Sequence, residues 1–232
     1  MIPGIDAVGQ RPDGTRVYFV AADDVVGTMA DKALASARRS IVLPDDADIA
    51  KVAAAMNPAM SSWVALRRRV RIQPGQSVLV LGATGNAGAM AVQVARRLGA
   101  GRVVGAGRDP GRLAALTSAG ADEVVQLTAD DDATARALAA AAAESDIVLD
   151  YLWGKPAQQA IPALLTARAD RSREMNWIQI GSVAGPAMEL PSLVAEITAG
   201  TIAVKATTMP LADVEQIWCR AEMPGERTVL VP

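Results

Sequence analysis

The chain has 232 residues, of which 51% are hydrophobic, so it can bury one sizeable core with at most a small appended domain. Its 23 lysines and arginines against 25 aspartates and glutamates give a formal charge of −2, which excludes the basic field that binding to nucleic acid requires. With no histidine and a single cysteine, Cys219, it can form neither an intrachain disulfide nor a Cys/His metal site.

The opening residues lack the apolar stretch of a secretory signal, and no later run is long enough to cross a bilayer, which predicts a soluble, cytoplasmic protein. Short β-type runs at Val17–Val20 and Ser40–Leu43 then indicate part of a small β domain. After Pro44, apolar residues at helical spacing predict a helix that breaks at Asn57-Pro58 and resumes. Its basic end, Arg67–Arg69, is either solvated or a phosphate site.

Strands and helices alternate in the middle of the chain. The strand runs are continuously apolar, as expected for strands covered on both faces, and right-handed crossovers then give an open parallel sheet. The sequence therefore predicts an α/β fold with a doubly wound parallel sheet, whose strands are Ser77–Leu81, Arg102–Ala106, Glu123–Gln126, Ile147–Tyr151 and Trp177–Ile180. Beyond it we expect a helix at Ser192–Ala199, an extended piece at Ile202–Val204, a helix at Leu211–Arg220 and a strand at Thr228–Val231.

The first of these strands runs directly into a glycine-rich turn and an amphipathic helix, the context in which such a turn binds a dinucleotide. One glycine allows the tight turn, one lets the pyrophosphate approach the backbone, and one allows close helix packing, while helix amides face the phosphates. Thr84 and Asn86 either bond to phosphate or only cap the helix. The residues expected at the pyrophosphate are Gly82, Thr84, Gly85, Asn86, Ala87 and Gly88.

The second strand ends in Gly107-Arg108-Asp109, where an NAD-binding domain would place an acidic residue against the ribose. The Arg108 guanidinium suits a 2′-phosphate and Arg112 lies one helical turn further on, so NADPH is the preferred cofactor. The alternative is that Arg108 is an exposed loop residue and Asp109 binds the ribose, although Asp109 before Pro110 is also a natural N-cap.

Two further segments follow the fourth and fifth strands, at the sheet edge where open α/β sheets bind ligands. Tyr151 after the fourth strand, and Gly181 with Ser182 after the fifth, are candidate walls for the nicotinamide ribose. The alternatives are aromatic packing under a loop for Tyr151 and Trp153, and a simple turn for Gly181-Ser182. Cys219 lies beside Trp218 with no base nearby, so it is interpreted as a packing residue.

Four segments together resemble the zinc-free quinone oxidoreductase branch of the medium-chain dehydrogenase/reductase superfamily: Pro3–Gly9, Gly82–Gly88, Gly107–Pro110 and Pro210–Glu215. The resemblance implies a partial GroES-like β domain formed by residues 1–43 and 206–232, and a Rossmann NADPH-binding domain formed by residues 44–205. By similarity, Ser61 contacts the nicotinamide end of the cofactor. A helix cap after Pro58 is the alternative for this residue.

The resemblance also indicates shortening. Family members carry opening strands of the β domain before the Pro3–Gly9 segment, and a further helix and a subunit-pairing strand where this chain has Pro191-Ser192. We therefore expect an enzyme that passes hydride from NADPH to a small-molecule quinone, enone or aldehyde without metal, with water or a hydroxyl such as that of Tyr151 giving the proton. The alternative is an NADPH-binding module with little or no catalysis, and the usual homodimer cannot be assumed.

Overall fold

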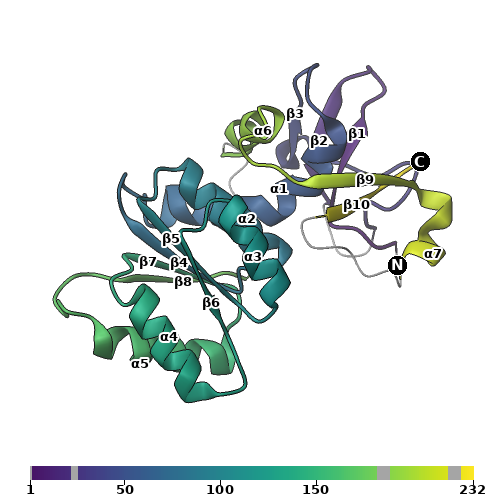
Figure 1. Ribbon diagram of the computed structural model, residues 1–232. Helices are drawn as coiled ribbons and strands as arrows, with labels where there is room; N and C mark the ends of the chain where they lie inside the picture. Colours follow the sequence, from purple (N-terminus) through teal and green to yellow (C-terminus); the bar gives the residue numbers. More distant parts are fainter. Residues whose placement is uncertain (1, 22–25, 182–188, 219–225) are drawn as a thin grey trace. The chain divides into compact units, whose positions relative to one another are not determined.

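The five apolar runs in the middle of the chain form one parallel sheet in the computed structural model, which describes residues 2–21, 26–181, 189–218 and 226–232 (Figure 1). The strand order is β6-β5-β4-β7-β8, so the first strand lies at the centre and β8 at one edge. The predicted doubly wound α/β fold is confirmed. The strands are β4 (Ser77–Leu81), β5 (Arg102–Gly107), β6 (Glu123–Gln126), β7 (Ile147–Asp150) and β8 (Asn176–Gln179).

Helices cover both faces of this sheet, with α4 and α5 together on one face and α2 and α3 on the other (Figure 1). Leu79 and Leu81 of the central strand have no exposed surface and join Leu138 of α4 and Leu164 of α5 in one apolar cluster. Burial on both faces explains why the strands lack polar alternation. The helices are α2 (Asn86–Arg97), α3 (Pro110–Ser118), α4 (Asp131–Ala142) and α5 (Gly154–Ala167).

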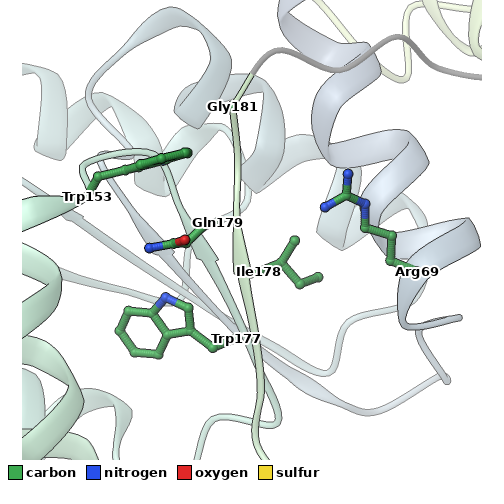
Figure 2. A pocket seen from close by; sticks show the side chains of 6 residues that line it. All are labelled: Arg69, Trp153, Trp177, Ile178, Gln179 and Gly181. Carbon is green, nitrogen blue, oxygen red and sulfur yellow. The ribbon is translucent and has the colours of Figure 1, made fainter.

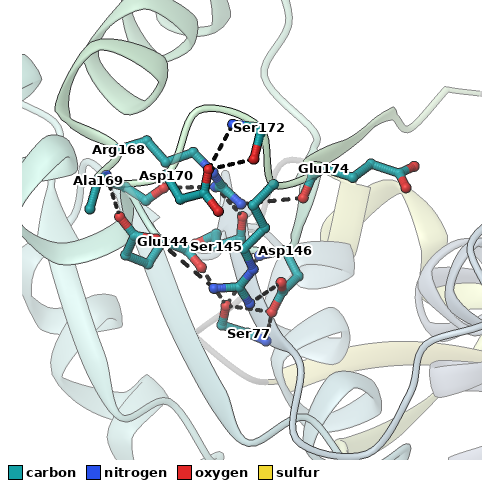
Figure 3. Close-up of polar contacts among 11 residues, drawn as sticks. Ser77, Glu144, Ser145, Asp146, Arg168, Ala169, Asp170, Ser172 and Glu174 are labelled. Carbon is teal, nitrogen blue, oxygen red and sulfur yellow. Dashed lines mark hydrogen bonds and ion pairs between the residues drawn. The ribbon is translucent and has the colours of Figure 1, made fainter.

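A buried arginine donates hydrogen bonds to backbone carbonyl groups at the amino-terminal end of the sheet (Figure 3). Arg168, which is 3% exposed at the end of α5, donates to the carbonyl oxygens of Ala143 at 2.9 Å and Ser145 at 2.8 Å. A third bond, of 3.2 Å, reaches the carbonyl of Glu174 shortly before β8. One guanidinium thus satisfies the carbonyl groups that follow α4 and also binds the segment that leads into the edge strand β8.

The chain divides into two compact units, residues 61–184 with the parallel sheet and residues 1–60 with 185–232. The second unit contains an antiparallel sheet in the order β1-β2-β3 and a parallel pair, β9 and β10. Its strands are β1 (Asp6–Gln10), β2 (Arg16–Val20), β3 (Ser40–Val42), β9 (Lys205–Pro210) and β10 (Glu226–Val231), and its shorter helices are η1 (Ala37–Arg39), α6 (Leu190–Thr198), η4 (Leu211–Asp213) and α7 (Val214–Trp218).

The predicted helix break at Asn57-Pro58 is wrong. Helix α1 (Ile49–Val64) passes through Pro58, and a π-helical segment η2 (Ala65–Arg69) continues it. An interior proline removes one backbone bond and costs about 3 kcal/mol. Val52, Met56 and Trp63 on either side are buried, and burying a large apolar side chain contributes about 1.5–3 kcal/mol each, which offsets that loss.

The last part of the chain differs from the prediction in two places. Ile202 and Val204 are buried but precede the strand, because pairing with β10 begins only at Lys205. The helix expected at Leu211–Arg220 starts as a 3-10 turn and becomes α-helical at Val214, and its predicted end lies outside the described residues. The terminal strand is confirmed within β10. No helix in the described ranges has the length and apolar character needed to cross a membrane.

Candidate functional site: the carboxyl end of the parallel sheet

The turn after β4 is held by the neighbouring strand. The amides of Gly82 and Ala83 both donate to the carbonyl oxygen of Ala106 at 2.9 Å, and the Gly85 amide donates back to Gly82 at 3.1 Å. Gly82 has φ of +89°, a conformation that a side chain would strain. The sequence Gly-Ala-Thr-Gly therefore folds into a tight connection from the sheet to helix α2.

The three glycines of this turn differ in what surrounds them. A β-carbon at Gly88 would lie 2.2 Å from the Gly82 carbonyl oxygen and 2.7 Å from the α-carbon of Ala83, so helix and strand pack too closely for any side chain. A β-carbon at Gly85 would meet only the Gly82 oxygen, at an ordinary 3.5 Å. The fold thus requires glycine at 88, whereas the space beside Gly85 is available to a ligand. A phosphate group fits this cradle.

Helix α2 begins with Gly85 as its N-cap, and a glycine has no side chain with which to cap the first-turn amides. The N-cap position is thus occupied by Gly85 and not by Thr84 or Asn86. Thr84 instead packs against Gly107, where a β-carbon would be 2.4 Å from its methyl carbon. First-turn amides have no partner within a helix and carry its positive dipole end, so this helix start favours an anion.

Two arginines accompany the turn at the end of β5. Asp109 is the N-cap of α3, with its carboxylate accepting from the Arg112 amide at 2.8 Å, as its position before Pro110 predicts. The Arg112 side chain donates to the Thr84 carbonyl at 3.3 Å, which keeps it beside the turn. Arg108 is exposed, and among the described residues no carboxylate pairs with it. The arrangement leaves a guanidinium, not a carboxylate, available at the strand end.

Ser61 and Tyr151 meet on the other side of the turn. Their hydroxyl oxygens are 3.0 Å apart, and Tyr151 also bonds to the buried Ser62. Ser61 lies inside helix α1, so the alternative of a helix cap is wrong. A β-carbon at Gly82 would be 3.1 Å from that of Tyr151, so the tyrosine lies against the glycine turn.

Burial raises the pKa of the Tyr151 phenol, and its hydrogen bonds with Ser61 and Ser62 oppose the rise only in part. The phenol therefore stays protonated at neutral pH, where it can donate a hydrogen bond to a ligand oxygen.

Asp150, at the end of β7, organises the residues that follow, a role not predicted from the sequence. It has no exposed surface, and its carboxylate accepts from the amides of Leu152 at 2.9 Å and Trp153 at 3.0 Å. Its second oxygen accepts from the Trp177 indole at 3.3 Å. The sequence signal for this role is an acidic residue that ends an otherwise apolar strand.

Trp153 is 46% exposed, so packing under a loop does not describe it. Its ring lies beside Gly181, where a β-carbon would be 3.2 Å away, and together with Trp177 they line a cavity of about 680 Å³ (Figure 2). Ser182 and Cys219 lie outside the described residues. Within the described ranges, no group of three His, Cys, Asp or Glu side chains has the arrangement of a metal site.

Comparisons with known proteins agree with this fold. The Zinc-binding dehydrogenase family profile matches residues 87–170. A probable NADPH-dependent quinone reductase of Emericella nidulans is 30% identical over 222 residues, covering 78% of this chain and 61% of that protein. The quinone oxidoreductase of Homo sapiens is 34% identical over 124 residues, or 52% of this chain and 37% of that protein. The chain thus spans less than two thirds of these relatives.

Solved structures give the same result for the fold. The Escherichia coli quinone oxidoreductase in complex with NADPH superposes with a TM-score of 0.76 at 18% identity, covering 99% of this chain and 82% of that one. A Pseudomonas syringae quinone oxidoreductase also gives 0.76, at 17% identity, with 99% and 81% covered. The sheet order and glycine turn define a Rossmann-type α/β protein. Within that class, the chain is similar to quinone oxidoreductases, and residues 87–170 match the Zinc-binding dehydrogenase family.

Proposed function

We propose that the chain is an oxidoreductase that transfers hydride from NADPH to a small quinone, enone or aldehyde without a metal. The observation that carries the proposal is the space beside Gly85 at the start of α2, with Arg108 and Arg112 at the end of the next strand. It is supported by the 30% identity to a protein described as a probable NADPH-dependent quinone reductase.

In this proposal the cofactor lies along the carboxyl end of the sheet. The pyrophosphate binds at the turn, and the 2′-phosphate is bound by Arg108 with Arg112 beside it. The nicotinamide end lies at Ser61 and Tyr151, whose hydroxyl groups are in contact, with Tyr151 packed against Gly82. The proposed contacts are Ser61, Gly82, Thr84, Gly85, Asn86, Ala87, Gly88, Gly107, Arg108, Arg112, Tyr151, Gly181 and Ser182.

Bound NADPH supplies a hydride, and the residues of the chain orient the acceptor and manage the charge that forms on it. The neutral phenol of Tyr151 donates a hydrogen bond to the acceptor oxygen, which becomes negative as the hydride arrives. Ser61 fixes the direction of that phenol through the 3.0 Å contact. Because its pKa is raised, the phenol keeps its proton and acts as a hydrogen-bond donor. Water then supplies the proton that the reduced acceptor takes up.

Two measurements test the proposal: titration of the protein with NADPH and NADH, and steady-state NADPH oxidation with a quinone, an enone and an aldehyde. We expect tighter binding of NADPH than of NADH, and turnover that added EDTA leaves unchanged. If neither nucleotide binds, the proposal is wrong. Binding without oxidation of NADPH by any acceptor would favour the alternative, a binding module. We also propose a cytoplasmic location and two domains. Residues 1–43 and 206–232 form the partial GroES-like β domain, and residues 44–205 form the Rossmann NADPH-binding domain.

A further inference from the structure

A second recess lies along β8, the edge strand of the parallel sheet, and of its lining residues only Gly181 also belongs to the proposed cofactor contacts. It is the cavity of about 680 Å³ that Figure 2 shows from close by, and its size falls in the range of about 300–1,000 Å³ typical of small-molecule sites. The lining side chains come from β8, the loop after β7 and the end of η2: Arg69, Trp153, Trp177, Ile178, Gln179 and Gly181.

The two tryptophans of this cavity are held in place from within the protein. Trp177 packs against the core cluster and donates its indole N–H to Asp150 at 3.3 Å. Trp153 donates its indole N–H to the Ile180 carbonyl at 2.8 Å and its backbone amide to Asp150. Since both indole N–H groups are already bonded, the rings offer the cavity their aromatic surfaces and no polar donor.

The conformation of Trp153 is unfavourable for the chain alone. It has φ of +58°, which residues other than glycine adopt only with strain, and nearly half of its large apolar surface is exposed. Strain of this kind concentrates at ligand sites. Two hydrogen bonds, from the backbone amide and from the indole, hold Trp153 in a strained and exposed conformation, which points to a ligand that covers it.

The polar groups of the cavity come from Arg69 and Gln179. Neither side chain has a hydrogen-bond or ion-pair partner in the described part of the chain. The neighbouring Arg67 behaves differently, because its guanidinium lies over the Trp63 ring at 5.1 Å. The basic triplet at the end of η2 is therefore divided, with one arginine engaged with the protein and another facing the recess.

We propose that this recess binds a planar aromatic molecule that carries an anionic oxygen. In Figure 2, Trp153, Trp177 and Gln179 lie on one side of β8 and Arg69 lies on the other, so the ligand lies across the open edge of the strand. Its ring contacts the indole surfaces, its anionic oxygen pairs with Arg69, and a second polar substituent bonds with the Gln179 amide. The site is separate from the glycine turn, since Tyr151 and Leu152 contact Gly82 whereas Trp153 lines the recess. The residues that recognise the ligand, Trp153, Trp177 and Arg69, are not among the proposed cofactor contacts.

The test uses 2-naphthoate as the probe and 2-acetylnaphthalene as its uncharged counterpart, titrated by calorimetry without nucleotide. We expect saturable binding of 2-naphthoate, weakened roughly tenfold to a hundredfold in Arg69→Gln because a charge-assisted hydrogen bond is lost. The uncharged probe is expected to bind equally to both proteins. Arg68→Gln, on the same segment but outside the recess, is the matched control.

A second pair of variants tests the aromatic surface. Trp153→Leu is expected to remove binding of both probes, whereas Trp218→Leu, which changes another exposed tryptophan outside the recess, leaves it intact. Gly85→Val should also leave 2-naphthoate binding intact, so failure of the nucleotide proposal does not affect this result. The inference is overturned by the absence of saturable binding at millimolar 2-naphthoate, or by equal losses in Arg69→Gln and Arg68→Gln, or in the two tryptophan variants.

Discussion

The hydroxyl oxygens of Ser61 and Tyr151 lie 3.0 Å apart, although 90 positions separate the two residues in the chain. One belongs to a helix before the sheet and the other follows the fourth strand of that sheet. Their contact brings together two residues that are each proposed for the nicotinamide end, and Tyr151 also packs against Gly82 of the turn.

Alkaline titration tests the environment of the two tyrosines, the only ones in the chain. Burial raises the pKa of both Tyr151 and Tyr18, and in Tyr18 the charge of Asp6 and a 2.8 Å bond to it add to the effect. We expect no tyrosinate absorbance at 295 nm near pH 10 while the protein is folded, and ordinary titration in denaturant.

The sign of the effect on stability follows. Above pH 10 the unfolded chain releases two phenolic protons that the folded chain retains, so unfolding becomes more favourable as pH rises. Stability from these groups is complete below pH 10 and declines above it. In Tyr151→Phe the decline should be smaller. A phenol that ionises near pH 10 in the folded protein would contradict this account.

Substitutions at two glycines of the turn should separate ligand binding from folding. Gly85→Val is expected to abolish NADPH binding with little change in melting temperature, because its β-carbon has room but its branched side chain occupies the phosphate space. Gly88→Ala should instead destabilise the fold, since its β-carbon would lie 2.2 Å from a carbonyl oxygen. Thermal unfolding and nucleotide titration of both variants check the prediction, and the same phenotype in both would refute it.

Arg108→Ala should discriminate between the two nucleotides. The guanidinium is directed at the 2′-phosphate, and a charge-assisted hydrogen bond is worth about 1.5–3 kcal/mol, so NADPH affinity should fall roughly tenfold to a hundredfold while NADH affinity is unchanged. Arg136→Ala, an exposed arginine on α4, is the control. Titrations with both nucleotides give the answer, and equal losses for NADPH and NADH would rule out the assignment.

Replacing Arg168 with Met should strongly destabilise the parallel-sheet unit. The change keeps much of the apolar stem but leaves the carbonyls of Ala143 and Ser145 without their donor, at a cost on the order of 1–3 kcal/mol for each one that stays buried. Arg171→Met nearby, which removes an exposed side chain, should have little effect. Urea unfolding compares the two variants, and similar midpoints would show that water replaces the lost bonds.

The parallel sheet was predictable because its information is local: each strand is a short apolar run, and the turn at Gly82 follows one of them directly. The course of α1 through Pro58 was not, since burial of Val52, Met56 and Trp63 depends on tertiary contacts that override the local signal.

The site shows the same division. The glycines of the turn and the capping role of Asp109 follow from neighbouring residues, and both could be interpreted from sequence. The roles of Asp150 and Arg69 could not, because the first depends on an indole from another strand and the second on a cavity that exists only after folding.

The β-rich unit is assembled from both ends of the chain, residues 1–60 and 185–232, whereas the parallel-sheet unit is continuous. During synthesis the continuous unit can close its core as soon as residue 184 has left the ribosome. Strands β1 to β3 are made first and pair among themselves, but the unit that contains them also includes residues 185–232, which are made last. The earliest part of this protein to be translated therefore belongs to a unit that is complete only after residues 185–232 have been made, whereas the middle of the chain can fold during synthesis.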